Sequence, residues 1–238
     1  MTASASITLD AVSKEYATPA GPVRALDGIT FELEAGRSLA ITGPSGCGKS
    51  TLLGLLAGLE PPSTGRVAIG DVDISRLAER DRVQMRRDQL GLVFQADNLL
   101  PFLTALENVG LQLALAGSGE YSRGVELVRE LGLEDHSHKL PDQLSGGQRQ
   151  RVAVAGALIK EPRVILADEP TGSLDADNSS AVIDLLLAAQ RDTGATLVVV
   201  THDASVAERM DRTLRLRDGR LVDAGASVER GERARSRA

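Results

Sequence analysis

Short runs of mostly apolar residues recur along the chain, and longer segments with apolar residues at helical spacing separate them. A run that is apolar throughout is typical of a strand buried on both faces, as in a parallel sheet. Strands that alternate with helices predict a mostly parallel sheet covered by helices on both faces, which places the chain in the α/β class. The buried runs are residues 38–42, 91–94, 164–167 and 196–200.

Two regions depart from this alternation. Residues 6–34 and 65–70 contain strand-like segments divided by turns, which predict a small antiparallel sheet in the N-terminal part. About residues 96–160 contain helical stretches, which predict a helical subdomain inserted between two strands of the parallel sheet. Within it, the Leu/Phe/Pro segment at 98–103 has two interpretations: it packs inside the subdomain, or it receives a helix of another protein.

The ordered part of the chain is expected to end just after a last hairpin. Residues 214–222 place apolar positions on both sides of an Asp-Gly pair, which is a hairpin signal. From residue 224 onward the chain holds mainly small and charged residues, a composition typical of disorder. We therefore predict one domain over residues 1–223 and a disordered, charged tail over residues 224–238.

The composition favours a soluble domain without a nucleic-acid surface. The chain has 238 residues, of which 42% are hydrophobic, and its formal net charge is −6. Binding to phosphate backbones depends on positive charge, so we expect no nucleic-acid partner. The single cysteine excludes an internal disulfide framework and a Cys-rich zinc module. No signal-peptide pattern and no apolar run near the about 18 residues that cross a bilayer is present, which predicts a cytoplasmic protein.

The clearest chemistry lies at residues 43–51, Gly-Pro-Ser-Gly-Cys-Gly-Lys-Ser-Thr. The segment follows a buried strand and precedes leucines at helical spacing, which is the context of a phosphate-binding loop rather than of an ordinary glycine-rich turn. Its glycines leave backbone N–H groups open to an anion, and the next helix adds the positive end of its dipole. Lys49 would reach the β- and γ-phosphates, and Ser50 would ligate Mg²⁺. The predicted nucleotide contacts are Gly43, Pro44, Ser45, Gly46, Cys47, Gly48, Lys49, Ser50 and Thr51.

Polar residues also follow the other buried strands. Gln95, the pair Asp168 and Glu169, and His202 each come at or just after a strand end. Ligands of open α/β sheets bind at the carboxyl ends of the strands, so these side chains should meet the phosphate-binding loop. Neighbouring strand residues point in different directions, so one carboxylate could hold magnesium while the other faces an attacking water. A solvated strand end is the alternative interpretation.

A second anion-binding corner is predicted near the end of the inserted subdomain. Leu-Ser-Gly-Gly-Gln occupies residues 144–148 and opens a helix, where backbone N–H groups and the helix dipole favour an anion. A helix cap alone would explain Ser145, but not the two glycines and the glutamine together. The candidate residues are Ser145, Gly146, Gly147 and Gln148.

A tyrosine, the single cysteine and two histidines each have two interpretations. Tyr16 either packs on the antiparallel sheet or offers a stacking surface for an adenine ring. Cys47 is either an activated thiol, because Lys49 and a helix N-terminus favour the thiolate, or a shielded residue in a tight position. His136 and His138 lie in a polar connection and are expected to be solvated rather than metal ligands.

Together, these motifs resemble those of an ATP-binding cassette (ABC) ATPase, from residue 6 to about residue 222. The Leu-Ser-Gly-Gly-Gln sequence is the most specific of them, because other phosphate-loop ATPases lack it. The resemblance implies a P-loop NTPase core that uses ATP and Mg²⁺. It also implies a head-to-tail homodimer, in which each ATP lies between the phosphate-binding loop of one subunit and residues 145–148 of the other.

The same match implies a role for each candidate residue. Glu169 would polarise the attacking water, His202 would contact the γ-phosphate, and Tyr16 would stack on adenine. The implied catalytic residues are Lys49, Gln95, Glu169 and His202; the implied Mg²⁺ ligands are Ser50, Gln95 and Asp168; the implied contacts to the ATP of the other subunit are Ser145, Gly146, Gly147, Gln148 and Asp175.

At a finer level, residues 98–101, 106–109 and 167–175 resemble a bacterial branch of lipoprotein-release, macrolide-export and cell-division-type cassettes. This implies a separate transmembrane permease as partner and a peripheral place at the inner face of the cell membrane. Two functions stay open: driving export of a lipoprotein, lipid, drug or peptide, and signalling through the membrane partner without transport. A soluble ATPase of DNA repair or translation fits poorly, because the chain has neither a long insertion nor a second cassette. The substrate, the direction of transport and the permease are not indicated.

One position departs from the pattern of the family that the chain resembles. The helix after residues 144–148 usually reads Ala-Arg-Ala-Leu, and here residues 155–158 read Ala-Gly-Ala-Leu. Gly156 in a helix interior costs about 1 kcal/mol relative to Ala. The arginine that the family pattern places near the site is absent. We therefore make no prediction for the rate of ATP turnover, whereas ATP binding is expected to persist.

Overall fold

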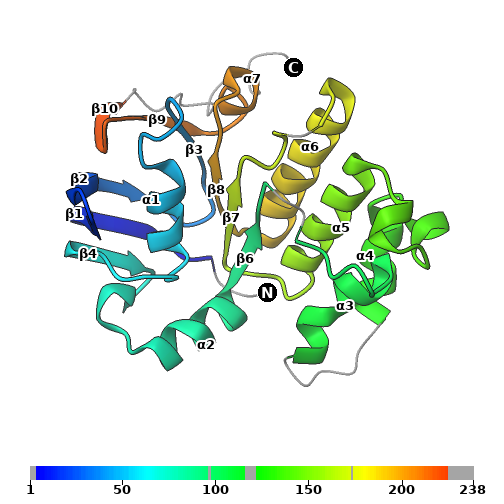
Figure 1. The fold of residues 1–238 in the computed structure, drawn as a ribbon. Helices are drawn as coiled ribbons and strands as arrows, with labels where there is room; N and C mark the ends of the chain where they lie inside the picture. Colours follow the sequence, from blue (N-terminus) through cyan, green and yellow to red (C-terminus); the bar gives the residue numbers. More distant parts are fainter. Residues whose placement is uncertain (1–3, 96–97, 116–121, 173, 225–238) are drawn as a thin grey trace, which may run out of the picture.

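The computed structural model describes residues 4–95, 98–115, 122–172 and 174–224. A six-stranded sheet runs through its centre in the order β10-β9-β3-β8-β7-β6 (Figure 1). The strands from β9 to β6 are parallel to their neighbours, and the edge strand β10 is antiparallel to β9. The predicted mostly parallel sheet is therefore confirmed. Its strands are β3 (Ser38–Thr42), β6 (Leu90–Val93), β7 (Val164–Asp168), β8 (Thr196–Val200), β9 (Arg212–Arg217) and β10 (Arg220–Ala224).

A second, antiparallel sheet has the order β2-β1-β4-β5 and confirms the sheet expected in the N-terminal part. Its first two strands are longer than the apolar pattern indicates, because they continue to a tight hairpin in which Thr18 pairs with Gly21. These outer ends are exposed, so their residues carry no hydrophobic alternation that sequence analysis could detect. The strands are β1 (Ile7–Thr18), β2 (Gly21–Leu33), β4 (Thr64–Ile69) and β5 (Val72–Asp73).

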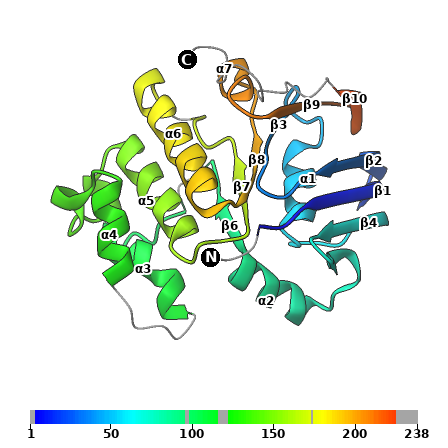
Figure 2. The ribbon, with the colours of Figure 1, turned by 180° about the vertical axis from the view of Figure 1, so that it is seen from behind.

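Helices cover both faces of the central sheet. Helix α1 lies between the two sheets, and α5 and α6 lie on the opposite side of the central sheet (Figures 1 and 2). The helical subdomain is inserted between β6 and β7, as expected, and contains α3, α4 and α5. The helices are α1 (Lys49–Leu56), α2 (Glu79–Gln89), α3 (Ala105–Leu115), α4 (Ser122–Glu130), α5 (Gly146–Leu158), α6 (Ala176–Thr193) and α7 (Ala204–Ala207), with 3-10 turns at Ile74–Arg76, Glu134–His136 and Pro141–Gln143.

The two faces of the central sheet belong to two separate hydrophobic clusters. Along β7, Val164 and Leu166 pack into the cluster with α1 and the antiparallel sheet. Ile165 and Ala167 pack into the cluster with the helices of the other face. All four side chains are fully buried. Because such a strand has no solvent-facing side, its first polar side chains come at its carboxyl end, and that end therefore forms the candidate site.

The C-terminal hairpin is also present, with Leu216 paired to Leu221 across the Asp218-Gly219 turn. Strand β10 includes residue 224, one residue beyond the expected domain limit, and the remainder of the expected tail, 225–238, lies outside the described residues. The limits of the domain and the tail stay predictions. Within the described chain, no helix combines the length and the apolar character needed to cross a membrane.

Candidate nucleotide-binding site

The loop at residues 43–48 connects β3 to α1, and its glycines fit where other residues would not. Gly43 and Gly48 have φ angles of 154° and 104°, in the region that favours glycine. A Cβ on Gly43 would lie 2.1 Å from the carbonyl oxygen of Leu216, and one on Gly48 would lie 2.5 Å from that of Ala25. The tight approach of neighbouring backbone therefore requires glycine at both ends of the loop.

Lys49 is the first residue of α1, and its side chain extends back to this loop. Its side chain is 8% exposed, and its Nζ donates hydrogen bonds to the carbonyl oxygens of Gly43 (2.9 Å) and Pro44 (3.0 Å). The ammonium group is thus held against the loop backbone, beside the N-terminus of α1. The positions of Lys49 and the loop glycines agree with the predicted phosphate-binding loop.

Cys47 is buried within the same loop. The residue is 4% exposed, and its Sγ is 2.7 Å from the place that a Cβ on Gly43 would occupy. Of the two interpretations of Cys47, this burial favours the shielded residue in a tight position. A reagent larger than water would have to displace part of the loop to reach the sulfur.

Asp168 ends β7 and faces Ser50 from the first turn of α1. Burial raises the pKa of Asp168, while a hydrogen bond with the Ser50 hydroxyl opposes this rise; the nearby Glu169 charge adds to the rise and Lys49 lowers it. The Oδ1 atom of Asp168 is buried without a hydrogen-bond partner among the described residues. A buried carboxylate oxygen without a partner, next to a hydroxyl, fits a divalent cation with oxygen ligands, so Ser50 and Asp168 fit the expected Mg²⁺.

Glu169 and His202 form a pair beside Asp168. The Oε2 atom of Glu169 lies 2.9 Å from His202 Nδ1 and accepts a second bond from the His202 N–H (3.3 Å). Glu169 lies beyond the end of β7 and has a φ of 45°, in the left-handed region. The two acids have different partners, Ser50 for Asp168 and His202 for Glu169, and the backbone leaves the strand conformation at Glu169.

Gln95 follows the end of β6 and approaches the loop after Glu169. Its side chain is exposed, and its Nε2 is 3.2 Å from the place of a Cβ on Gly172. The Gly172 N–H in turn donates to the carbonyl oxygen of Glu169 (3.0 Å). The end of β6 therefore places Gln95 against the turn that follows Glu169, and its contact with the metal and the attacking water stays a prediction.

The Leu-Ser-Gly-Gly-Gln segment forms a capped helix start at α5. Ser145 Oγ accepts from the Gln148 N–H (3.2 Å), and Gln148 Oε1 accepts from the Ser145 N–H (2.8 Å), so the two residues form a capping box. Gly147 is packed so closely that a Cβ would lie 2.3 Å from Asn178 Oδ1. Within the described residues, no hydrogen bond joins this corner to the phosphate-binding loop of the same chain.

Asn178 was not predicted as part of the site, although it joins two of the predicted residues. Its N–H and its Nδ2 donate to Asp175 Oδ1 (2.8 and 3.0 Å), and these hydrogen bonds hold the pKa of Asp175 below its usual value. Asn178 therefore connects Asp175, which caps α6, to Gly147 of α5. Ser173, between Asp168 and Asp175 in sequence, lies outside the described residues.

Tyr16 lies near the end of β1, with more than a third of its surface exposed. Its hydroxyl donates to Glu60, and Lys14 Nζ is 5.1 Å from the ring centroid. Partial burial raises the pKa of Tyr16, and the bond with Glu60 raises it further. Lys14 and Glu60, which contact the ring, were not predicted, and only the fold brings Glu60 to β1. The exposed ring is compatible with a stacked base.

The two remaining histidines lie apart from these residues in sequence, in the inserted subdomain. His138 is exposed, as expected. For His136 the expectation of a solvated ring was wrong in part, because its Nδ1 is buried without a hydrogen-bond partner in the described structure. No cluster of histidine, cysteine and carboxylate side chains able to hold a metal occurs in the described residues.

Gly156, where the sequence departs from the family pattern, faces another helix. A Cβ at this position would lie 3.7 Å from the carbonyl oxygen of Asn108 in α3. This is an ordinary van der Waals distance, so a methyl group fits between α3 and α5. The nearest neighbours of residue 156 belong to the inserted subdomain.

A parallel α/β sheet with a phosphate-binding loop after one strand and a carboxylate pair after another defines a P-loop nucleotide hydrolase. The sequence profile of the family described as "ABC transporter" matches residues 26–172. The chain therefore belongs to the ABC transporter family, as an ATP-hydrolysing, ATP-binding subunit.

The names of two relatives agree with this family. The chain is 47% identical, over 84% of its length, to the uncharacterized ABC transporter ATP-binding protein Rv0986 of Mycobacterium tuberculosis (strain ATCC 25618 / H37Rv), of which it covers 82%. It is 44% identical, over 90% of its length, to the lipoprotein-releasing system ATP-binding protein LolD of Legionella pneumophila (strain Paris), of which it covers 96%. These similarities confirm the branch that the motifs indicated.

A solved structure shows the same fold. The ATP-binding cassette MJ0796, in a dimeric post-hydrolysis state bound to ADP and Pi, superimposes with a TM-score of 0.85 at 40% identity. The comparison covers 91% of this chain and 97% of the solved chain. It supports the resemblance to a dimeric ATPase in both fold and sequence.

Proposed function

We propose that this chain is the ATPase subunit of a bacterial ABC transporter and hydrolyses ATP in a homodimer with two composite sites. The observation that carries the proposal is the Glu169–His202 pair beside Asp168, at the same edge of the sheet as the phosphate-binding loop. Glu169 orients and polarises the attacking water, and His202 contacts the γ-phosphate from the other side of the carboxylate. Bound Mg²⁺ would stabilise charge on the phosphate oxygens, with Ser50, Asp168 and Gln95 to hold it.

The proposed dimer follows from the position of the corner at the start of α5. The α5 N-terminus combines backbone N–H groups, the helix dipole and two glycines, which is a site for an anion. In this chain it makes no hydrogen bond to the phosphate-binding loop within the described residues. The related cassette MJ0796 is dimeric with ADP and Pi. We therefore assign Ser145, Gly146, Gly147, Gln148 and Asp175 to the ATP of the partner subunit.

The proposed membrane partner is a separate permease, which would place this subunit at the cytoplasmic face of the membrane. Asn108, which is 8% exposed, accepts from the Leu100 N–H (2.8 Å) and donates to the carbonyls of Leu103 and Thr104 (2.9 and 3.0 Å). These bonds fix the 98–104 segment and leave Phe102 72% exposed. An exposed aromatic side chain on a fixed segment suits contact with a partner helix. We infer export of a lipoprotein-like or lipid-like substrate, because a relative belongs to a lipoprotein-releasing system.

Mixing two inactive subunits tests the composite site. Lys49→Ala disables the phosphate-binding loop, and Ser145→Arg blocks the α5 corner with bulk and charge. Each variant alone is expected to lose hydrolysis, because both of its sites in a homodimer carry the defect. A mixed dimer keeps one site in which the loop and the corner are both intact, so ATPase activity should appear on mixing. Normal hydrolysis by Ser145→Arg alone would contradict the assignment of the corner to the partner's ATP.

A further inference from the structure

The turn between β9 and β10 lies directly against the phosphate-binding loop. The Gly219 N–H donates to the carbonyl oxygen of Cys47 (3.1 Å), and the Gly219 carbonyl accepts from the Asp27 N–H (2.8 Å). Gly219 has a φ of 73°, and a Cβ there would lie 2.8 Å from the Ala25 carbonyl oxygen. One glycine of a distant hairpin therefore bridges the loop and β2, at a position where a side chain does not fit.

This bridge fixes a peptide group of the loop. In a trans peptide the C=O and the following N–H point in opposite directions. Because the Cys47 carbonyl is directed at Gly219, the Gly48 N–H points away from the turn. Gly48 precedes α1, and backbone N–H groups of such a loop are the ones that receive phosphate. The turn thereby sets the orientation of one phosphate-binding donor.

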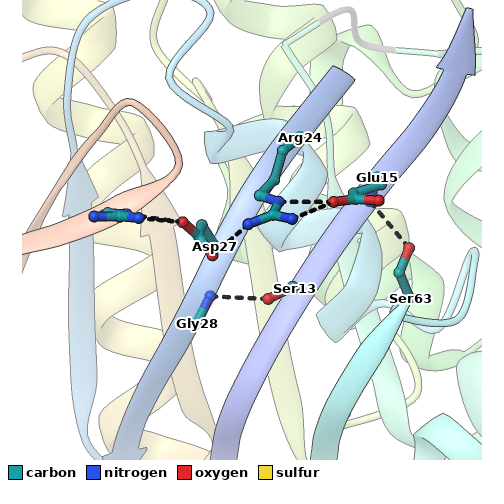
Figure 3. A network of polar contacts seen from close by, with 7 residues as sticks. Ser13, Glu15, Arg24, Asp27, Gly28 and Ser63 are labelled. Atoms are coloured by element: carbon teal, nitrogen blue, oxygen red, sulfur yellow. Dashed lines mark hydrogen bonds and ion pairs between the residues drawn. The ribbon is translucent and has the colours of Figure 1, made fainter. Parts of the chain in front are cut away.

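Ion pairs hold the turn in place (Figure 3). Arg220, next to Gly219, donates from Nε (2.9 Å) and Nη2 (2.5 Å) to Asp27 Oδ2. Asp27 also accepts from Arg24 (3.3 Å), which donates to Glu15 Oε1 (2.7 Å) beside Tyr16. The hydrogen bonds from Arg220 hold the pKa of Asp27 below its usual range. The chain of ion pairs therefore runs from the turn that touches the loop to the strand that carries the candidate adenine-stacking residue.

We propose that Gly219, Asp27 and Arg220 are positioning residues for ATP binding. Gly219 holds the Cys47–Gly48 peptide in its phosphate-accepting orientation, and the Asp27–Arg220 pair holds Gly219 against the loop. This inference rests on ATP binding at the loop. It adds the turn of the C-terminal hairpin to the elements that form that site. None of the three residues belongs to the motifs that carry the family resemblance.

Gly219→Ala tests the bridge, with Gly194→Ala as a matched control. Gly194, at the C-terminus of α6, has a φ of 74°, and a Cβ there would meet no atom within 4 Å. Both variants strain a left-handed residue, but only Gly219→Ala pushes the turn away from Ala25 and Cys47. We expect Gly219→Ala to raise the Kd for ATP and for ADP about fivefold or more, as loss of one hydrogen bond would do. Gly194→Ala should leave both dissociation constants unchanged.

Steady-state kinetics separates positioning from general damage. A loss of binding that affects ground state and transition state equally raises KM and leaves kcat at saturating ATP nearly unchanged. A purely structural role would lower the melting temperature and the active fraction of protein without changing Kd. Equal Kd values for Gly219→Ala and Gly194→Ala, measured by isothermal titration, would overturn the proposal.

Charge variants test the ion pair and decide the matter if Gly219→Ala does not fold. The Asp27 and Arg220 side chains are partly exposed, and such pairs change an equilibrium constant by at most about fivefold. Asp27→Asn and Arg220→Gln should each raise Kd by about two- to fivefold at low salt, and less at high salt. The double variant should be no worse than either single one, and Arg220→Lys should recover most of the affinity.

Glu34→Gln serves as the control for the charge variants. It alters another exposed pair, Glu34 with Arg37 (3.7 Å), so it should not change Kd. Additive effects of Asp27→Asn and Arg220→Gln, or no effect of either, would overturn the role of the pair. Failure of the wild-type protein to bind ATP would overturn the proposed function instead, so the two failures are distinguishable.

Discussion

Glu169→Gln isolates the charge of the proposed catalytic carboxylate. The side chain keeps its length, and Gln Oε1 can still accept from the His202 N–H and from a protonated Nδ1. The surrounding backbone is unaffected, because the Glu169 N–H donates to Val200 (2.9 Å) and the Glu169 carbonyl accepts from Gly172 (3.0 Å). The variant therefore removes the ability to polarise water without disturbing the fold of the site.

The expected effect is large on hydrolysis and absent on binding. A positioned base contributes typically about 10²- to 10⁴-fold. This corresponds to about 2.7–5.5 kcal/mol of activation free energy. The Glu169 charge raises the pKa of Asp168, so its removal lowers that pKa and favours the ionised form that would hold Mg²⁺. Binding of Mg-ATP should therefore be preserved or slightly strengthened.

Phosphate release measures the chemistry, and size-exclusion chromatography with light scattering measures the dimer. We expect Glu169→Gln to lose at least 99% of the hydrolysis rate, from the lower limit for a positioned base, and to accumulate as a dimer with Mg-ATP. Glu134→Gln, at an exposed carboxylate of the inserted subdomain, is the control and should behave as the wild type. A rate for Glu169→Gln within tenfold of the wild type would refute the catalytic assignment. A lost affinity for ATP would refute the separation of binding from chemistry.

Two further predictions concern the loop thiol and the helix glycine. Because Cys47 is 4% exposed, N-ethylmaleimide should label the native protein far more slowly than the urea-unfolded protein. Intact-mass measurement gives the extent of labelling, and rapid labelling of the native protein would contradict the shielding. Cys47→Ser should keep its ATPase activity. Gly156→Ala should stabilise the protein by about 0.4–1 kcal/mol, because the methyl group fits at 3.7 Å from Asn108 and the unfolded chain loses freedom. That gain corresponds to a rise in melting temperature of about 1–4 °C by calorimetry, and a fall would mean that α3 and α5 cannot accommodate the methyl group.

Much of the fold was predictable because strands that are buried on both faces consist almost entirely of apolar residues. Strands β3, β7 and β8 are buried on both faces, so their residues are almost all apolar and their ends are marked by polar residues. The outer halves of β1 and β2 were not predictable in the same way, because their residues are exposed and show no apolar pattern. Backbone pairing and the Glu15–Arg24 ion pair hold those halves together. Neither interaction leaves a recognisable pattern in the sequence.

The candidate site divides along the same line. Gly43, Lys49, Asp168 and Glu169 were predictable, because each lies at or shortly after the end of a buried strand. Glu60 and Gly219 were not, because their contacts with Tyr16 and Cys47 arise only when distant strands are brought together. A short motif records the chemistry that is local to one loop, whereas the groups that orient that loop come from other elements and have no motif of their own.

Asn178 shows what this means for the proposed partner site. Its Oδ1 lies so close to Gly147 that no other residue fits there, and its N–H and Nδ2 both bond to Asp175. The start of α5 and the start of α6 are therefore joined through one side chain. If the corner at Ser145 meets the ATP of the partner, Asp175 must approach the same partner surface with it, because Asn178 fixes their spacing. We therefore expect the start of α5 and Asp175, both assigned to the ATP of the partner subunit, to move together, so that a displacement of either one displaces the other.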